Sequence, residues 1–395
     1  MENHDLNLVD FAESSHPAIV TNMSPLYEVG SSADSLRIMK RTTACLIVHP
    51  RSGKNLAHVA DVVAVLAKAG WTTDVVVKES KGQTMELAAR ATDAGYDFVI
   101  AYGGDGTVNH VLNGVLAFRG KRTTAVGVIP GGTANVWAAE VGIPTDPVRA
   151  AESLIESAVR DVDVGHVGVE SITLGAERSD KDRNATSAAG ARRHFLLMAG
   201  IGADASLMGR ASTELKHKFG VAAVVVSAIK MLPSLTTYAV AVSAGDSAGR
   251  LWEGRALQLV VGNTRLYGKV TKMTPDALLD SGELDLSIIT ARSRWSAFTQ
   301  VVTVMLRGRP THAHSVTSRA AHLRVSAPAS VDLQLDGSAV KLKKYLNAAA
   351  RDALARAGDP ARAMVHYRFD AVPAALRIAV PREYGGALFS RGGER

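Results

Sequence analysis

The sequence predicts an α/β domain, built on a parallel sheet wrapped by helices, followed by a β-rich domain. Two patterns predict it: short β-branched runs alternate with helical periodicity from Ala44 to about Arg160, and strand-like runs dominate after Asp161. Continuous apolar runs are typical of strands buried on both faces, as in parallel sheets. The chain has 395 residues, 47% hydrophobic and 21% charged, which suits two or three domains and excludes wholesale disorder.

The strands and helices of the first domain follow from its apolar pattern. Continuous apolar runs predict strands at 44–48, 73–77, 98–102 and 125–129. Apolar residues at helical spacing predict helices at 56–67, 84–94 and 107–117. Asp146-Pro147 is typical of an N-cap followed by proline at the first helical position, so a further helix is expected to about residue 160. We expect this domain to span residues 41–162.

The rest of the chain predicts mainly strands. The expected strands lie at 162–169, 195–199, 238–242, 256–261, 284–289 and 323–335. Residues 175–193 are crowded with Ser, Asp, Lys, Arg and Asn and predict a flexible hairpin loop. We therefore expect a flexible polar leader over 1–40, a β-rich domain over 163–372, and a C-terminal strand and tail over 373–395 that could return to the first domain.

Composition limits the classes of partner and the compartment. A single cysteine, Cys45 in an apolar run, excludes a disulfide framework or a cysteine zinc site within one chain. The formal net charge of +7 is compatible with phosphate-bearing substrates or an anionic membrane surface. The leader lacks the pattern of a signal peptide, and the longest apolar stretch, 219–229, is too short to span a bilayer. We expect a cytoplasmic protein with no nucleic-acid partner.

The loop Gly103-Gly104-Asp105-Gly106-Thr107 directly follows the third expected strand. Its glycines allow the backbone to approach a polyphosphate closely enough for several N–H groups to donate. A carboxylate facing an anion is repulsive unless a cation lies between them or the carboxylate takes a proton from an incoming hydroxyl. Asp105 therefore predicts a phosphate site with its own metal ligand or base. The alternative is an ordinary tight turn, in which Asp is favoured for its local hydrogen bonds.

Two further polar loops follow expected parallel strands. His49-Pro50-Arg51-Ser52-Gly53 follows the first strand, and Gly131-Gly132-Thr133-Ala134-Asn135 follows the fourth. Because the carboxyl ends of parallel strands meet at one edge of a sheet, we expect the three loops to line one crevice. The chain has no Gly-x-x-x-x-Gly-Lys-Ser/Thr, and no Gly-x-Gly-x-x-Gly opens its first helix. A P-loop and a dinucleotide-binding fingerprint are thereby excluded.

These three loops together resemble the diacylglycerol kinase catalytic-domain family, which includes soluble bacterial diacylglycerol kinases and the related sphingosine and ceramide kinases. The resemblance centres on 103–109, continues through 194–205 and 275–285, and ends at 372–381, so it covers residues 42 to 381. It implies an N-terminal doubly wound α/β nucleotide-binding domain, like that of NAD kinase and phosphofructokinase, and a C-terminal β-sandwich domain.

The resemblance also implies a reaction. ATP would bind between the two domains, with Mg²⁺ bridging its phosphates and a lipid hydroxyl attacking the γ-phosphate. Asp204 stands where some family members contact the lipid headgroup, although it could equally be a loop cap, and Asp280 is the expected metal ligand. The family's ATP contacts carry over to His49, Pro50, Arg51, Ser52, Gly53, Gly103, Gly104, Gly106, Thr107, Val108, Asn109 and Thr133.

The sequence departs from the family pattern at two places. Asp336-Gly337-Ser338 stands where bacterial diacylglycerol kinases commonly carry Asp-Gly-Glu, whose Glu accepts a proton, and a serine cannot act as a base unaided. Asp280-Ser281-Gly282 stands where the family's structural magnesium loop has paired aspartates before glycine. Without the Glu, Asp105 becomes the main candidate to orient or deprotonate the hydroxyl, a role proposed for the equivalent aspartate in sphingosine kinases.

Between Ser338 and Val365 the chain is longer than the family pattern requires. Apolar residues at helical spacing among lysines and arginines predict a basic helix over about 340–362. Such a helix could lie on an anionic membrane surface. Its apolar face is small and rich in alanine, which favours packing on its own domain or on a dimer partner.

We therefore predict an ATP-dependent, magnesium-requiring lipid kinase that phosphorylates a hydroxyl of a diacylglycerol-like or sphingoid lipid. It could contact the inner face of the membrane peripherally and could form a homodimer. One alternative is an NAD kinase, which shares the Gly-Gly-Asp-Gly turn, although the loops at His49 and Gly131 fit the lipid kinases better. Another is a regulator that binds a lipid or nucleotide without chemistry, an alternative motivated by Ser338.

Overall fold

The chain folds into two compact units in a computed structural model. One unit takes the chain up to Arg160 together with Leu376–Tyr384, and the other takes Asp161–Ala375 and the chain from Gly385 on. The predicted leader, 1–40, lies outside the described residues. The structure describes residues 41–50, 55–80, 82–118, 123–174, 185–187, 193–202, 236–245, 249–268, 271–291, 293–310, 315–356 and 359–390.

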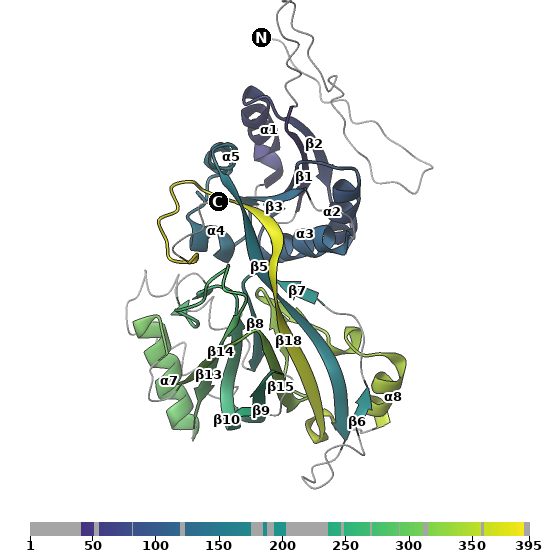
Figure 1. Ribbon diagram of the computed structural model, residues 1–395, viewed down its shortest axis with the longest axis vertical. Helices are drawn as coiled ribbons and strands as arrows, with labels where there is room; N and C mark the ends of the chain where they lie inside the picture. Colours follow the sequence, from purple (N-terminus) through teal and green to yellow (C-terminus); the bar gives the residue numbers. More distant parts are fainter. Residues whose placement is uncertain are drawn as a thin grey trace, which may run out of the picture. The chain divides into compact units, whose positions relative to one another are not determined.

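The first unit contains the parallel sheet that the apolar runs predict (Figure 1). Its strands are β1 (Thr43–Val48), β2 (Thr72–Val77), β3 (Phe98–Gly103) and β4 (Ala125–Pro130). They pair in the order β2-β1-β3-β4, and the end of β18 (Ala363–Val380) runs parallel to β4 with Ile378 opposite Val126. Because β1, β3 and β4 are covered on both faces, nearly all their side chains are buried. The predicted α/β class is confirmed.

Helices cover this sheet. They are α1 (Val59–Lys68), preceded by a 3-10 turn at Asn55–His58, and α2 (Gln83–Asp93), α3 (Asp105–Ala117), α4 (Val136–Val141) and α5 (Pro147–Ile155). α1 packs on α5 and α2 on α3, and Figure 1 shows the two pairs on opposite sides of the sheet. The close approach of α2 and α3 requires Gly114, since a Cβ there would lie 2.3 Å from the Met85 carbonyl oxygen.

The helix that begins at Asp146-Pro147 is shorter than the sequence predicts. Its N-terminus is as expected, because the Asp146 side chain accepts a hydrogen bond from the Arg149 N–H at 2.9 Å. It ends at Ile155, where the Ser157 hydroxyl donates to the Leu154 carbonyl at 2.7 Å. The expected end near residue 160 is wrong, because residues 158–160 already belong to β5 (Ala158–Leu174).

The second unit is built mainly of antiparallel strands. They pair in the order β17-β16-β8-β10-β9-β15-β18, with β5 beside β18 and with β13 and then β14 continuing from β10. Besides β5 and β18, the strands are β6 (Ala185–Ser187), β7 (Arg193–Phe195), β8 (Met198–Gly202), β9 (Tyr238–Ala244), β10 (Gly249–Gly262), β11 (Leu266–Tyr267), β12 (Thr271–Lys272), β13 (Leu284–Thr290), β14 (Ser315–Ala320), β15 (His322–Pro328), β16 (Leu333–Leu335) and β17 (Ser338–Val340).

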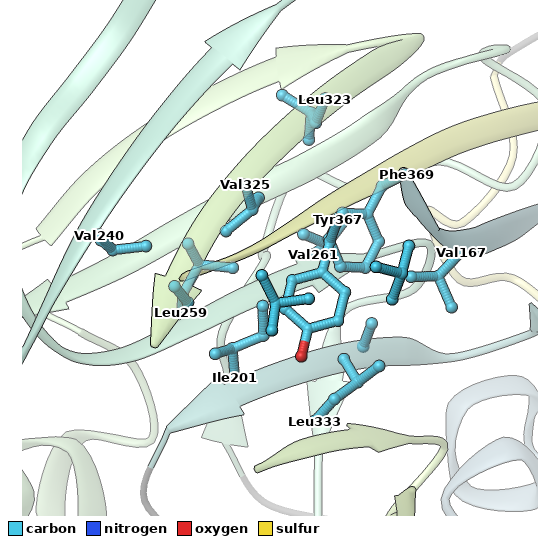
Figure 2. Close-up of a cluster of buried hydrophobic side chains, with 14 of the residues drawn as sticks. Val167, Ile201, Val240, Leu259, Val261, Leu323, Val325, Leu333, Tyr367 and Phe369 are labelled. Atoms are coloured by element: carbon cyan, nitrogen blue, oxygen red, sulfur yellow. The ribbon is translucent and has the colours of Figure 1, made fainter. Parts of the chain in front are cut away.

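One apolar core holds the second unit together (Figure 2). Alternate residues of β15 and β18, such as Val325 and Tyr367, point into it, as the period of two along a strand requires. Phe195 packs over Gly165 so closely that a Cβ at Gly165 would lie 2.0 Å from the ring. This core belongs to the second unit alone, so each unit has its own hydrophobic interior.

Among its described residues, the second unit also contains the helices α7 (Arg294–Arg307) and α8 (Ala348–Arg356). α7 lies between β13 and β14 in the chain, where the sequence predicts no helix. The basic segment forms a 3-10 turn at Leu342–Lys344, then α8 and a second turn at Pro360–Arg362. Tyr345, Leu346 and Ala350 enter the core, so this segment packs on its own unit. Within the described ranges, no helix combines the length and the apolar character needed to cross a bilayer.

Candidate active site

Three loops meet at the carboxyl edge of the parallel sheet in the first unit. The N–H of His49, just after β1, donates to the Tyr102 carbonyl at 3.0 Å. Gly103 at the end of β3 is opposite Pro130 at the end of β4, and the Gly131 N–H donates to the Gly103 carbonyl at 2.9 Å. The sheet register therefore brings the described part of each predicted phosphate loop to one edge.

Gly104 and Gly132 bring two of these loops into direct backbone contact. A Cβ at Gly132 would lie 2.4 Å from the Gly104 Cα, and a Cβ at Gly104 would lie 3.2 Å from the Gly132 Cα. Real side chains do not tolerate the first distance, so any residue other than glycine at position 132 would force the loops apart. Glycine is needed here for close approach, since neither residue has a positive φ.

Asn135 closes the third loop. Its Oδ1 accepts the Gly132 N–H at 2.9 Å, and its Nδ2 donates to the Gly132 carbonyl at 2.8 Å. Its backbone is left-handed, with φ 46°, a conformation that asparagine adopts more readily than most residues. Thr133 and Ala134 form the exposed tip of the loop. The predicted ligand Thr133 is therefore accessible to solvent.

Asp105 joins the second loop to the third. It is the first residue of α3, and its Oδ1 accepts the N–H of Trp137, in the first turn of α4, at 3.1 Å. Trp137 is only 1% exposed, so its indole anchors α4 in the interior. A carboxylate at the N-terminus of α3 also lies at the positive end of the helix dipole. Sequence reasoning assigned Asp105 a chemical role and missed this structural one.

The start of α3 presents backbone more than side chains. Gly104 has an extended backbone, and its carbonyl accepts hydrogen bonds from the N–H groups of Thr107 and Val108 at 2.8 and 3.1 Å. Thr107, Val108 and Asn109 are 4%, 4% and 7% exposed, and Thr107 packs where a Cβ of Gly103 would lie. The nucleotide contacts of Thr107, Val108 and Asn109 stay predictions. The predicted contacts of Gly104 and Gly106 would be made by their backbone N–H groups.

Several predicted residues lie outside the described part of the chain. Pro50 is the last described residue of the first loop, and Arg51, Ser52 and Gly53 follow it in an undescribed stretch. The predicted lipid contact Asp204 also falls outside the described residues. Their roles stay predictions.

Asp336 and Gly337 form the two-residue turn between β16 and β17, and Ser338 is the first residue of β17. Asp336 and Gly337 both have positive φ, 46° and 76°, as this hairpin turn requires. The Asp336 carboxylate is buried and accepts three backbone N–H groups, from Leu196, Leu197 and Met198, at 3.0, 2.9 and 3.1 Å. Ser338 is exposed. Asp336 therefore stabilises the start of β8, while position 338 faces solvent.

The predicted metal ligand Asp280 is bonded to the C-terminal segment. Its carboxylate accepts the Ser390 N–H at 2.9 and 3.0 Å and the Ser390 hydroxyl at 2.7 Å. Nearby Asp163 accepts the N–H groups of Gly282 and Ala374 at 2.6 and 2.8 Å. Burial raises the pKa of the Asp163 carboxyl, the two donors oppose that rise, and the Asp280 charge adds to it. Sequence reasoning missed both Asp163 and Ser390.

No ready-made metal cage is present among the described residues. None of their His, Cys, Asp and Glu side chains form a group of three or more placed to hold an ion. Asp280 could bind a metal only if the ion displaced or shared the three Ser390 hydrogen bonds. Asp280 therefore stays a predicted ligand.

Comparison with known families agrees with the two-part organisation. Residues 43–167 match the family described as the diacylglycerol kinase catalytic domain. Residues 197–380 match the one described as the YegS C-terminal NAD kinase β-sandwich-like domain. A diacylglycerol kinase of Bacillus subtilis (strain 168) is 30% identical over 303 residues, covering 76% of this chain and 90% of that protein. One of Staphylococcus saprophyticus is 29% identical over 300 residues, covering 75% and 89%.

Solved structures share the fold. A crystal structure of a diacylglycerol kinase from Bacillus anthracis str. Sterne matches with a TM-score of 0.58 at 18% identity, covering 87% of this chain and 99% of the other. A second structure, of a putative diacylglycerol kinase from the same organism, matches with a TM-score of 0.60 at 18% identity, covering 87% and 98%. The predicted combination of an α/β domain with a β-sandwich is confirmed.

Proposed function

The chain belongs to the diacylglycerol kinase family, and we propose that it transfers the γ-phosphate of ATP to the hydroxyl of a diacylglycerol-like lipid in a magnesium-dependent reaction. Membership makes the chain a lipid kinase, and a kinase family implies the use of ATP. The named relatives support diacylglycerol over a sphingoid base as the acceptor, since they are diacylglycerol kinases and the chain spans about nine-tenths of each.

The observation that carries the proposal is the backbone contact of Gly104 with Gly132 beside Asp105. Because neither loop has a side chain at this contact, a polyphosphate could approach the backbone N–H groups of Gly104 and Gly106. Both residues lie at the start of α3, where the helix dipole favours an anion. We assign ATP to this edge of the first unit and the lipid to the second unit.

The residues present at this edge suit a magnesium ion carried by nucleotide. Mg²⁺ is commonly held by one or two carboxylates together with substrate phosphates, and does not need an all-protein cage. Asp105 can supply such a carboxylate. When bound, the ion would neutralise charge on the transferring phosphoryl group. Asp280, which belongs to the second unit, is a second proposed metal ligand.

Asp105 is the proposed proton acceptor. As the lipid oxygen bonds to the γ-phosphorus, the bond from that phosphorus to the bridging oxygen of ADP breaks, and Asp105 takes the hydroxyl proton. Ser338 cannot serve as this base, since a serine hydroxyl is far too weakly acidic to be ionised unaided. Phosphoryl transfer depends mainly on positioning and charge neutralisation, so a weakly basic carboxylate suffices.

The test is a substrate panel with radiolabelled ATP. Protein, Mg²⁺ and γ-labelled ATP are incubated separately with detergent-dispersed diacylglycerol, ceramide or sphingosine, and with NAD. We expect label in phosphatidic acid only, most of it lost in Asp105→Asn and retained in the control Asp61→Asn, which alters an exposed aspartate on α1. Label in NAD, or nucleotide binding without transfer to any acceptor, would reject the proposal.

A further inference from the structure

α7 has an ordinary buried face. Ala297, Val301 and Val304 are at most 4% exposed, and Gln300 beside them is 5% exposed. The helix is capped at both ends: the Ser293 hydroxyl accepts the Ser296 N–H at 3.1 Å, and Gly308 ends the helix with a left-handed φ of 68°. These contacts fix which side of α7 faces the unit and which faces outward.

The outward side of α7 is also apolar. Val302 and Leu306 follow Trp295 by seven and eleven residues, which places each of them within about 20° of Trp295 around the helix, and Phe298 lies beside them. Trp295 is 71% exposed and Leu306 38%, while Phe298 and Val302 are half-buried. The Trp295 and Phe298 rings meet edge to face, with centroids 6.1 Å apart. We call these four side chains the α7 stripe.

Positive charge accompanies the stripe. Arg307 and Arg309 are exposed at the C-terminal end of α7. The Lys272 N–H donates to the Gly308 carbonyl at 2.6 Å, which brings the exposed Lys272 to the same end. In the sequence, no Asp or Glu occurs between Asp285 and Asp332, whereas this stretch contains six arginines. No ion pair to Arg307 or Arg309 is found among the described residues, so carboxylates there do not neutralise this end of the stripe.

We propose that the α7 stripe docks the protein on an anionic lipid bilayer. A helix with tryptophan, phenylalanine and leucine on one side and flanking cations lies in the plane of the interface, with its apolar side chains entering the boundary between headgroups and acyl chains. Tryptophan favours this depth because its ring is apolar and its indole N–H is polar. Arg307, Arg309 and Lys272 meet the lipid phosphates. The inference rests on the proposed function, since a lipid kinase must reach a substrate held in a bilayer.

The basic segment around α8 does not offer the same surface. Its apolar residues Tyr345, Leu346 and Ala350 are buried in the core, so its exposed residues up to Arg356 are charged or are small alanines, without a large apolar side chain. Lys343 and Lys344 are exposed, which makes them a matched control for Arg307 and Arg309. Likewise Leu251, 40% exposed on β10, is a matched control for Leu306.

The experiment measures vesicle binding without ATP or diacylglycerol. Protein is sedimented with phosphatidylcholine vesicles that contain or lack phosphatidylglycerol. We expect wild-type protein to bind the anionic vesicles. Trp295→Ser with Leu306→Ser should lower the partition constant at least about tenfold, because two apolar side chains that would enter the bilayer are lost. Arg307→Gln with Arg309→Gln should lower it about tenfold on anionic vesicles only.

The controls decide whether the effect belongs to the α7 stripe. Leu251→Ser, and Lys343→Gln with Lys344→Gln, should leave binding within about twofold of wild type. The proposal is overturned if the stripe variants bind like wild type or if these controls weaken binding equally. It is also overturned if the stripe variants turn a dimer into a monomer in ultracentrifugation, since the surface would then join two copies. A fall in their Tm well beyond that of Leu251→Ser would overturn it too, because the stripe would then pack on the chain itself.

Failure of this inference is distinguishable from failure of the proposed function. Phosphorylation of a short-chain diacylglycerol in detergent micelles requires no vesicle binding, so the stripe variants should keep wild-type turnover there. Protein that phosphorylates micellar lipid and ignores vesicles rejects only the docking surface. Protein that binds vesicles through α7 and phosphorylates no lipid rejects only the kinase assignment.

Discussion

The Asp105 carboxylate has two separable tasks, and two substitutions distinguish them. Asp105→Asn keeps an oxygen that can accept the Trp137 N–H but removes the negative charge, whereas Asp105→Ala removes both. We expect turnover to fall about 10²- to 10⁴-fold in the Asn variant, the range for loss of a general base, with stability little changed. The Ala variant should also lose about 1–3 kcal/mol of stability, because the Trp137 N–H loses its partner.

Urea unfolding and turnover of both variants check this prediction. If Asp105→Asn unfolded as easily as Asp105→Ala, the carboxylate charge itself would be holding α4 in place. If Asp105→Asn kept wild-type turnover, another group would accept the proton, and the catalytic assignment of Asp105 would fail.

The contact between Gly104 and Gly132 predicts a graded response to alanine. At Gly132 the new Cβ would meet the Gly104 backbone at 2.4 Å, where only movement of a loop relieves the clash. We expect Gly132→Ala to cost about 1–3 kcal/mol of stability and to lower turnover about 100-fold, because small displacements of phosphate ligands are costly. At Gly104 the corresponding distance is 3.2 Å, so a shift of a few tenths of an ångström accommodates it. Equal losses in the two variants, by thermal unfolding and turnover, would contradict this order.

At the scale of single elements, β5, β15 and β18 carry a polar face opposite the core of the second unit. His366 lies in it with both ring nitrogens bonded: Nε2 to the Thr173 hydroxyl at 2.8 Å and Nδ1 to the Ser326 hydroxyl at 2.7 Å. Burial lowers the pKa of His366, and the charge of Glu170 only partly opposes this. Asp370, by contrast, has a lowered pKa because Arg368 and His322 outweigh its burial.

The lowered pKa of His366 predicts that acid destabilises the second unit. As the pH falls below about 6.5, His366 takes up a proton in the unfolded chain before it does so in the folded one, so stability falls until the folded pKa is reached. His366→Gln can still bond the two hydroxyls but does not titrate. We expect its free energy of unfolding to depend less on pH than that of wild type between about pH 7 and 5. Protonation of Asp370 affects the stability in a separate and lower pH range, below the ordinary pKa of an aspartate. Parallel pH curves for the two proteins would rule out this role for His366.

Elements with one clear apolar pattern could be predicted from the sequence, and those with a mixed pattern could not. β1, β3 and β4 are continuous apolar runs because both faces are buried, so their existence and order follow from residue type alone. α7 is apolar on its outward face as well, and its valines and threonines also favour strands, so no helical face stands out. The end of α5 was misplaced because β5 begins at Ala158, only three residues after Ile155.

In the candidate site, too, some residues could be predicted from the sequence and others could not. The glycines and Asp105 could be found because their chemistry is local to one loop. The Trp137 N–H that Asp105 binds, and the Ser390 that Asp280 binds, lie 32 and 110 residues away in the chain. Which distant backbone group meets a carboxylate depends on packing, and one sequence carries no direct signal of it. Next to Ser338, the residue types of Asp336 and Gly337 indicate a hairpin turn. They do not indicate which three N–H groups donate hydrogen bonds to the Asp336 carboxylate.

At the scale of the whole molecule, the two units have separate cores, and the described ATP residues all lie in the first. A ligand that binds only the folded form of one unit stabilises that unit by mass action, by about 2.7 kcal/mol when present at 100 times its Kd. An ATP analogue that cannot be cleaved, given with Mg²⁺, should therefore slow amide exchange up to about 100-fold in α3 and in the loop before α4. Amides of β9 and β15, in the core of the second unit, should exchange at their former rate. Hydrogen exchange followed by mass spectrometry measures both regions in one sample. Slower exchange confined to β9 and β15 would place the nucleotide in the second unit, and the assignment of ATP to the glycine loops would then be wrong.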